Sequence, residues 1–122
     1  MSGPDQGLAR RQRLTRSADF RAVYDAGRKA VGRGMVLYLL PRPEGALRLG
    51  VVTGRKVGGA VQRTRARRLL REAYRRNRHR FTGAIDVVII GRAALLKMKW
   101  PDIERELLAL AQRAGLMDAP PA

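Results

Sequence analysis

The 122-residue sequence contains no cysteine and only one histidine, His79. Without thiols it forms no disulfide, zinc knuckle, iron–sulfur cluster or cysteine nucleophile. His79 lies in an arginine-rich run and has no second ligand at metal spacing, which favours a solvated or phosphate-contacting histidine over a catalytic one. The composition therefore points away from metal and redox chemistry in the protein itself.

Long apolar runs are also missing. The longest, at residues 35–40 and 87–90, are far too short to span a bilayer. The first five residues, Met-Ser-Gly-Pro-Asp, begin no apolar signal segment. We therefore expect a cytoplasmic protein with no membrane partner.

Acidic residues are scarce. Ten Asp and Glu face 26 Lys and Arg, for a net charge of +16. Self-repulsion at that charge opposes a compact monomer and favours a polyanionic partner, nucleic acid before a membrane surface. All but four of the 26 basic residues are arginines. Arginine grips phosphate bidentately and stacks on bases, although a GC-rich gene would produce the same bias.

The apolar pattern predicts one α+β domain over residues 14–117, between a basic arm at 1–13 and a tail at 118–122. Expected helices begin after Ser17, span 60–80, and run from Pro101 to a stop at Gly115. The expected strands are 35–40, 47–53 and 85–90, with a further short strand near 55–57. We predict that the first two form a hairpin. The basic helix joins two strands, which predicts a βαβ crossover in a small sheet packed by helices.

Residues 60–80 carry nine arginines and one acid, Glu72. Five of the arginines recur at steps of four, four, four and three, which places them on one side of a helix: Arg63, Arg67, Arg71, Arg75 and Arg78. Like charges at this spacing destabilise a free helix, whereas phosphates would offset their repulsion through charge-assisted bonds and counterion release. A merely solvated face is the alternative, but one acid leaves few ion-pair partners.

The loop at residues 54–59 enters this helix with three glycines around Arg55-Lys56-Val57. Glycines let backbone N–H groups approach a phosphate, and the helix start adds positive potential. The Gly-Lys-Ser/Thr ending of a Walker A loop is missing. The loop therefore indicates part of a basic RNA-contacting surface and not a nucleotide site.

Three aromatic residues, Phe20, Tyr24 and Tyr38, allow two interpretations. On or beside a sheet they could stack unpaired bases, but the spacing of Phe20 and Tyr24 is also that of ordinary core residues and by itself favours a place in the core.

The acidic residues do not form an arrangement that indicates a catalytic site. Asp86 lies inside an apolar strand, and no pair has the spacing of a two-metal nuclease or of acid–base carboxylates.

Residues 56–73 read Lys-Val-Gly-Gly-Ala-Val-Gln-Arg-Thr-Arg-Ala-Arg-Arg-Leu-Leu-Arg-Glu-Ala. This run resembles the signature of the protein subunit of bacterial ribonuclease P, Lys-Val-Gly-Asn-Ala-Val-x-Arg-Asn-Arg-hydrophobic-Lys-Arg-Leu-hydrophobic-Arg-Glu. The resemblance extends from about residue 10 to residue 117. It departs at Gly54, Arg55, Gly59 and Ala66, and at Thr64, which replaces the central Asn and presents a hydroxyl in place of an amide.

The resemblance implies a compact two-layer α/β sandwich with a left-handed βαβ crossover, like that of a ribosomal protein domain. In the family, the RNA subunit is the catalyst and uses Mg²⁺ to remove the 5′ leader from precursor tRNA. The protein binds that RNA and the leader and lowers the magnesium requirement, and one protein is expected for each catalytic RNA. Neither a catalytic side chain nor a dedicated metal site is expected in the protein.

Position by position, the resemblance also implies site residues. The residues expected to contact the catalytic RNA are Arg55, Lys56, Arg63, Thr64, Arg65, Arg67, Arg68, Arg71 and Arg75. The residues expected to line the leader cleft are Phe20, Tyr24, Tyr38 and Lys56. With the resemblance included, leader contact becomes the preferred role of the aromatic residues.

Three other functions remain open at this point. A ribosomal or other structural RNA-binding protein would have the same charge without stimulating cleavage. A self-sufficient nuclease would need a carboxylate or histidine cluster, which the sequence lacks. A DNA-binding protein would use its basic helix to discriminate among duplex sequences, whereas we predict a preference for structured RNA.

Overall fold

The computed structural model describes residues 13–81 and 83–116. The predicted basic arm, apart from Arg13, and the predicted tail lie outside these ranges. The elements in chain order are α1 (Ser17–Ala26), β1 (Arg28–Val31), β2 (Met35–Pro41), β3 (Arg48–Thr53), the 3-10 turn η2 (Arg55–Val57), α2 (Ala60–Asn77), η3 (Arg78–Arg80), β4 (Ile85–Gly91), η4 (Ala93–Lys97) and α3 (Trp100–Ala114).

The four strands form one mixed sheet in the order β1-β2-β4-β3. β1 pairs antiparallel with β2, and β2 with β4, while β3 runs parallel to β4. β4 has a partner on each side and helices over both faces, so all but one of its residues are buried. Its nearly continuous apolar sequence follows from that central position.

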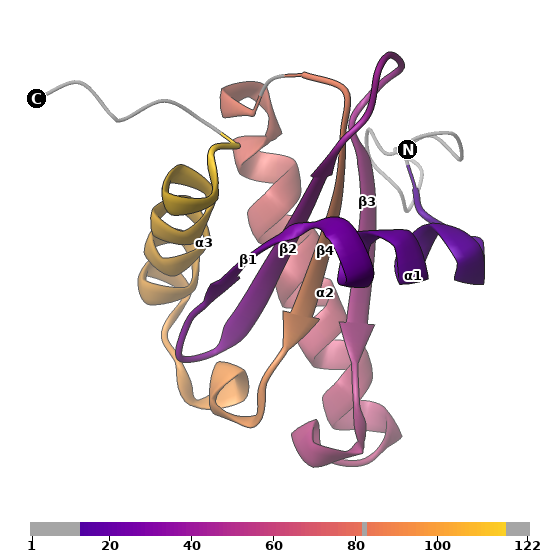
Figure 1. Ribbon diagram of the computed structural model, residues 1–122. Helices are drawn as coiled ribbons and strands as arrows, with labels where there is room; N and C mark the ends of the chain where they lie inside the picture. Colours follow the sequence, from indigo (N-terminus) through magenta and orange to yellow (C-terminus); the bar gives the residue numbers. More distant parts are fainter. Residues whose placement is uncertain (1–12, 82, 117–122) are drawn as a thin grey trace, which may run out of the picture.

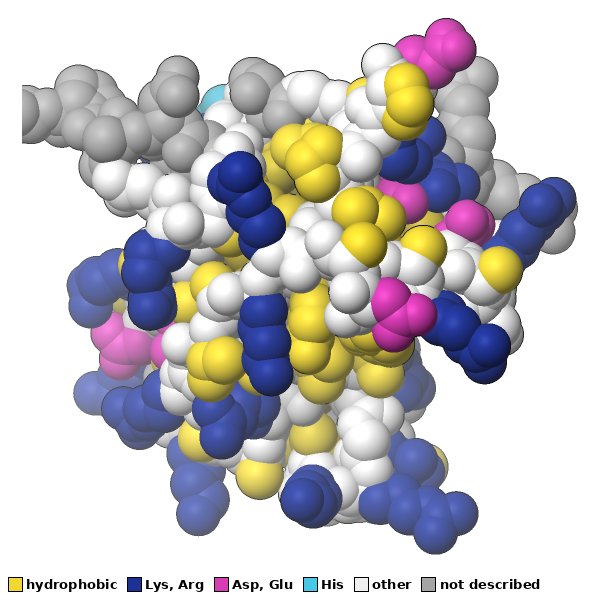
Figure 2. Space-filling view, in the orientation of Figure 1, with side chains coloured by type: hydrophobic (Ala, Val, Ile, Leu, Met, Phe, Trp, Pro, Cys, Tyr) yellow, Lys and Arg dark blue, Asp and Glu magenta, His cyan; other side chains and the backbone are white. Residues whose placement is uncertain are grey.

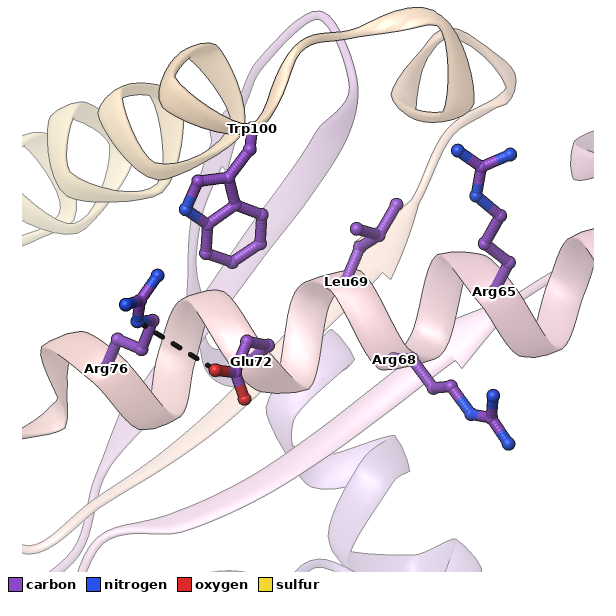
Figure 3. Close-up of a pocket in the computed structure, with 6 residues that line it drawn as sticks. All are labelled: Arg65, Arg68, Leu69, Glu72, Arg76 and Trp100. Carbon is purple, nitrogen blue, oxygen red and sulfur yellow. Dashed lines mark ion pairs between the residues drawn. The ribbon is translucent and has the colours of Figure 1, made fainter.

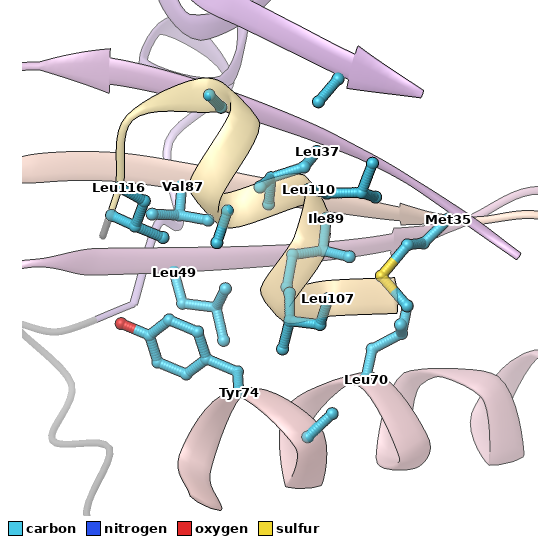
Figure 4. Packing of buried hydrophobic residues seen from close by; sticks show 14 of the residues in the cluster. Met35, Leu37, Leu49, Leu70, Tyr74, Val87, Ile89, Leu107, Leu110 and Leu116 are labelled. Atoms are coloured by element: carbon cyan, nitrogen blue, oxygen red, sulfur yellow. The ribbon is translucent and has the colours of Figure 1, made fainter. Parts of the chain in front are cut away.

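Helices cover the two faces of the sheet unequally (Figure 1). α2 and α3 lie together on one face, where the larger core forms (Figure 4). α1 crosses the other face over a smaller cluster of Leu14, Val23 and Val88. Because side chains alternate along a strand, Val87 and Ile89 of β4 face α2 and α3, while Val88 faces α1.

The crossover from β3 through α2 to β4 is left-handed. In Figure 1 both strands run downward and α2 lies behind the sheet, while the chain moves from β3 on the right to β4 on its left. Nearly all parallel crossovers are right-handed. The resemblance therefore predicted correctly a feature that the general rule would have predicted wrongly.

Two local predictions are wrong. The segments 35–40 and 47–53 do not form a hairpin, because β4 lies between β2 and β3. The hairpin partner of β2 is β1, a four-residue strand that the sequence pattern does not reveal because two of its residues are basic and only Ala30 is buried. The short segment 55–57 is a 3-10 turn and not a strand, with the Val57 N–H donating to the Gly54 carbonyl.

All three predicted helices form, although the second ends at Asn77 and residues 78–80 continue as the 3-10 turn η3. The sequence placed a stop for the last helix at Gly115, which has a φ of 90° in the left-handed region. Glycine adopts that conformation without steric cost. The N–H of Leu116 then donates to the Ala111 carbonyl, and the buried Leu116 side chain closes the end of the core.

Asp86 is the one buried acid among the described residues, and it joins three strands. Its carboxylate accepts two hydrogen bonds from Arg48 of β3, at 2.8 and 2.7 Å, and lies 2.8 Å from Nε of Arg42, just beyond β2. Arg48 also reaches Asp19 of α1 at 3.5 Å. This ion-pair network fastens α1 to the ends of the strands, which explains an acid inside an apolar strand without any catalytic role.

We predict that Asp86→Ala lowers the free energy of unfolding by about 3 kcal/mol, because it leaves two partly buried guanidinium groups without their anion. Asp102→Ala is the matched control, since its exposed pair with Arg105 contributes less than about 1 kcal/mol. Urea unfolding measures both. Equal losses in the two variants would contradict the structural role of Asp86.

Tyr74 gives the fold a pH dependence. Burial in the core raises the pKa of Tyr74 from 10.0 to about 12, partly opposed by the charge of Arg78. Because the folded protein disfavours the ionised form of Tyr74, the free energy of unfolding keeps its full value below pH 10 and falls as the pH rises towards 12. The loss is of the order of 2 kcal/mol, and it should be absent in Tyr74→Phe. Unfolding measured in both proteins between pH 9 and pH 12 tests this; parallel curves would contradict it.

Candidate nucleic-acid interface

α2 separates apolar from cationic residues. Its buried positions, Ala66, Leu70, Ala73 and Tyr74, pack towards the sheet. Apart from the buried Asn77, the remaining positions are exposed or half-buried and carry six of the predicted RNA-contacting arginines: Arg63, Arg65, Arg67, Arg68, Arg71 and Arg75. The helix therefore presents to solvent the positive surface that the sequence predicted.

The guanidinium of Arg67 is held in place by two threonines. Its Nη1 donates to Thr53 Oγ1 at the end of β3, at 2.9 Å, and its Nη2 donates to Thr64 Oγ1 at 3.2 Å. The Thr53 hydroxyl in turn donates to the Arg63 carbonyl at 3.4 Å. Thr64, the departure from the family's Asn, thus serves as an acceptor that helps to orient an arginine on the helix surface.

Arg75 differs from its neighbours because Glu72 already pairs with it. Its Nε and Nη2 donate to the two carboxylate oxygens at 3.0 and 2.7 Å. This hydrogen bonding, with the charges of Arg75 and Arg76, lowers the pKa of Glu72, and it raises the pKa of Arg75. Of the predicted contacts, Arg75 is therefore the one whose charge is most nearly balanced within the helix.

The η2 turn places Arg55 and Lys56, both exposed, at the start of α2. Gly58 between them and the helix has a φ of 142°, a conformation available to glycine but strained for other residues. The two side chains thus extend the cationic surface beyond the helix terminus, where unpaired N–H groups add positive potential.

An aromatic cleft lies on the opposite face of the sheet, between α1 and the strands. The ring centroids of Phe20 and Tyr24 are 6.5 Å apart, and those of Tyr24 and Tyr38 are 5.1 Å apart and nearly perpendicular. A groove of about 440 Å³ runs beside them, lined by Ser17, Phe20, Arg21, Tyr24, Asp25 and Val52. In Figure 2 hydrophobic side chains gather on this face, with Lys and Arg on several sides of them.

The three aromatic residues differ in how far they are buried. Phe20 and Tyr38 are half-buried and pack against the Leu14, Val23 and Val88 cluster. Tyr24 is 40% exposed, and partial burial together with the neighbouring Tyr38 raises the pKa of its hydroxyl. The core residues thus form the floor of the cleft and Tyr24 its accessible edge.

The cations that the structure places beside the cleft are Arg21 and Lys29. Lys56 lies in η2 and is not among the residues that line the groove, whereas Arg21 is. Lys29 of β1 stands opposite Tyr38 in the strand register, with its Nζ 5.7 Å from the ring centroid. Recognition of β1 would have revealed Lys29, because paired residues project from the same face of a sheet.

Among residues 13–81 and 83–116, no three His, Asp or Glu side chains lie close enough together to hold a metal ion. No helix in these ranges has both the length and the apolar character needed to cross a membrane. What the described chain offers is cationic and aromatic surface.

A cationic helix on one face of a small mixed sheet and an aromatic cleft on the other define a basic α+β RNA-binding protein. The sequence model of the Ribonuclease P family matches residues 8–115. The chain belongs to that family, the protein subunit of the tRNA-processing enzyme ribonuclease P.

Relatives and solved structures agree with this assignment. The ribonuclease P protein component of Symbiobacterium thermophilum is 39% identical over 106 residues, covering 86% of this chain and 92% of that protein. The component from Pelotomaculum thermopropionicum is 37% identical over 103 residues, covering 84% and 92%. The structure of the Staphylococcus aureus protein superposes with a TM-score of 0.78 at 25% identity, covering 88% of this chain and 98% of that one.

The Phe20 ring at the floor of the cleft packs closely against Gly50 of β3. A Cβ at this position would lie 2.5 Å from Cε1 and 2.6 Å from Cζ of Phe20. We predict that Gly50→Ala displaces the Phe20 ring, lowers the free energy of unfolding by about 1–3 kcal/mol and weakens binding of a single-stranded RNA oligonucleotide several-fold.

Gly54→Ala is the control, because a Cβ there has no neighbour within 4 Å. Urea unfolding and the anisotropy of a labelled oligonucleotide measure the two effects. If both variants behaved alike, the contact between Phe20 and the Gly50 backbone would not shape the cleft.

Proposed function

We propose that this protein binds the ribonuclease P RNA through the surface of α2 and η2, and holds the 5′ leader of precursor tRNA in the aromatic cleft. Membership of the family implies the RNA partner. The observation that supports two roles is the placement of two chemically different surfaces on opposite faces of one sheet. Arginines suit the phosphates of folded RNA, and aromatic rings suit unpaired bases.

The protein would act by charge and position. Arginines of α2 neutralise phosphates of the catalytic RNA, so that RNA and precursor tRNA approach with less repulsion. The same positive charge replaces part of the diffuse Mg²⁺ that the RNA would otherwise need. Hydrolysis itself belongs to the RNA and its magnesium ions, and one protein for each catalytic RNA suffices for this role.

In the cleft, Tyr24 offers a ring edge and a protonated hydroxyl, while Lys29 and Arg21 supply charge for the leader phosphates. Stacking of a base on an aromatic side chain contributes about 1–3 kcal/mol and tolerates any sequence. A leader held in this way would position the precursor without a contact to the scissile phosphate.

We expect purified protein to stimulate cleavage of end-labelled precursor tRNA by a bacterial ribonuclease P RNA at a Mg²⁺ concentration too low for the RNA alone. The measurement is appearance of the mature 5′ end, which should require both components. Tight RNA binding without stimulation would indicate a structural RNA-binding protein. Cleavage by the protein alone would indicate a self-sufficient nuclease.

Two substitutions should separate the surfaces. Arg67→Ala should weaken binding to the ribonuclease P RNA by about three- to tenfold, with leader binding unchanged. The slope of the logarithm of the binding constant against the logarithm of salt concentration should fall in magnitude by about one, because one fewer counterion is released. Tyr24→Ala should weaken leader binding about fivefold or more, with binding to the catalytic RNA unchanged.

Arg105→Ala is the control for the loss of one positive charge, because Arg105 is exposed on α3 and its ion pair within residues 13–81 and 83–116 is with Asp102. It should leave both affinities within twofold of the wild type. If either Arg67→Ala or Tyr24→Ala weakened binding of both the ribonuclease P RNA and the leader, the assignment of separate surfaces would be contradicted.

A further inference from the structure

A second aromatic groove lies between α2 and the start of α3, on the face of the sheet opposite the aromatic cleft (Figure 3). The groove is open to solvent, has a volume of about 420 Å³ and is lined by Arg65, Arg68, Leu69, Glu72, Arg76 and Trp100. Trp100 is the only tryptophan of the chain. We call this site the Trp100 groove.

Trp100 is the first residue of α3, and its indole points towards α2. The ring packs against the core and is only partly buried. The guanidinium of Arg76 lies over it, 5.8 Å from the ring centroid. Leu69 projects from α2 towards the same space (Figure 3), so the groove has an apolar floor and an accessible aromatic wall.

The rim of the groove is positive. Its single acid, Glu72, is paired with Arg75 at 2.7 Å and lies 3.9 Å from Arg76. Within residues 13–81 and 83–116, Arg65 and Arg68 are exposed and have no ion pair or side-chain hydrogen bond. Arg65 extends on the same side of α2 as Trp100, whereas the guanidinium of Arg68 points away from the ring (Figure 3). An anionic ligand in the groove would therefore meet the Arg65 guanidinium, which no carboxylate of the described chain neutralises.

An aromatic ring, an aliphatic side chain and uncompensated arginines are the components that bind an unpaired nucleotide. The base has a flat face for the indole, and the phosphate accepts bidentate hydrogen bonds from arginine. A base within a duplex is stacked on both faces and cannot enter. These features define the ligand as a single-stranded nucleotide.

We propose that the Trp100 groove binds one unpaired nucleotide of the ribonuclease P RNA, with the base against Trp100 and Leu69 and the phosphate at Arg65. The inference rests on the proposed function. The catalytic RNA is the source because Arg65 and Arg68 belong to the α2 surface proposed to bind it. A leader held in the aromatic cleft lies across the sheet from the groove.

Fluorescence of the wild-type protein tests the proposal directly, because selective excitation of tryptophan reports on Trp100 alone. Addition of ribonuclease P RNA should quench the emission and protect it from acrylamide at least twofold, whereas a single-stranded leader oligonucleotide should do neither. RNA binding without protection of Trp100 would overturn the proposal. Protection by the leader alone would also overturn it, because the ligand would then come from the wrong RNA.

The double variant Tyr24→Trp/Trp100→Phe is the matched control, since it moves the single reporter into the aromatic cleft. Its emission should respond to the leader oligonucleotide. A response of this variant to the leader, together with a silent wild-type Trp100, shows that the assay detects leader binding where it occurs.

Affinity supplies an independent readout. Trp100→Leu should weaken binding to the ribonuclease P RNA about tenfold while Trp100→Phe stays within threefold, and urea unfolding shows whether each variant is folded. Equal affinities for Leu and wild type would overturn the proposal while leaving the proposed function intact, provided that cleavage is still stimulated. Absence of any stimulation by the wild type would instead contradict the proposed function itself.

Discussion

The apolar side of α2, packed against β3 and β4, holds in place a helix whose other sides repel one another. Ala66, Leu70, Ala73 and Tyr74 are buried there, and their burial stabilises a segment with nine basic residues between positions 60 and 80. The same packing presents the arginines to solvent along the helix, with Arg67 oriented by Thr53 and Thr64. The repulsion between these arginines would destabilise an isolated helix. In the folded protein, packing of the apolar side offsets that repulsion and holds the arginines in a cationic surface.

The opposite face of the sheet depends on a second constraint, the incomplete cover provided by α1. One short helix buries Val23 over Val88 but leaves Tyr24 accessible and Tyr38 half-buried. The Asp86 network fixes where α1 crosses, since Arg48 pairs with Asp86 and also reaches Asp19. The small core and the open cleft are therefore two consequences of the same placement, and two surfaces of different chemistry share one sheet.

Much of this arrangement could be predicted from the sequence. Regular spacing of apolar residues predicted all three helices, and the mostly apolar run at 85–90 predicted the central strand. Strand pairing could not be predicted, because local pattern says nothing about which strand lies beside which; the insertion of β4 between β2 and β3 depends on the long-range crossover. The missed β1 is short and largely exposed, and with it Lys29 was missed. Lys56 was placed at the cleft by resemblance alone, whereas the structure has Arg21 lining the groove.

The central claim is that two RNAs occupy opposite faces of one sheet at the same time. The most direct measurement is the anisotropy of a fluorescent leader oligonucleotide bound to the protein, followed as ribonuclease P RNA is added at low salt. The account predicts that the anisotropy rises above that of the binary complex, because the larger RNA binds the same protein without displacing the leader. A fall to the value of the free oligonucleotide would mean that both RNAs compete for one surface, and it would contradict the account.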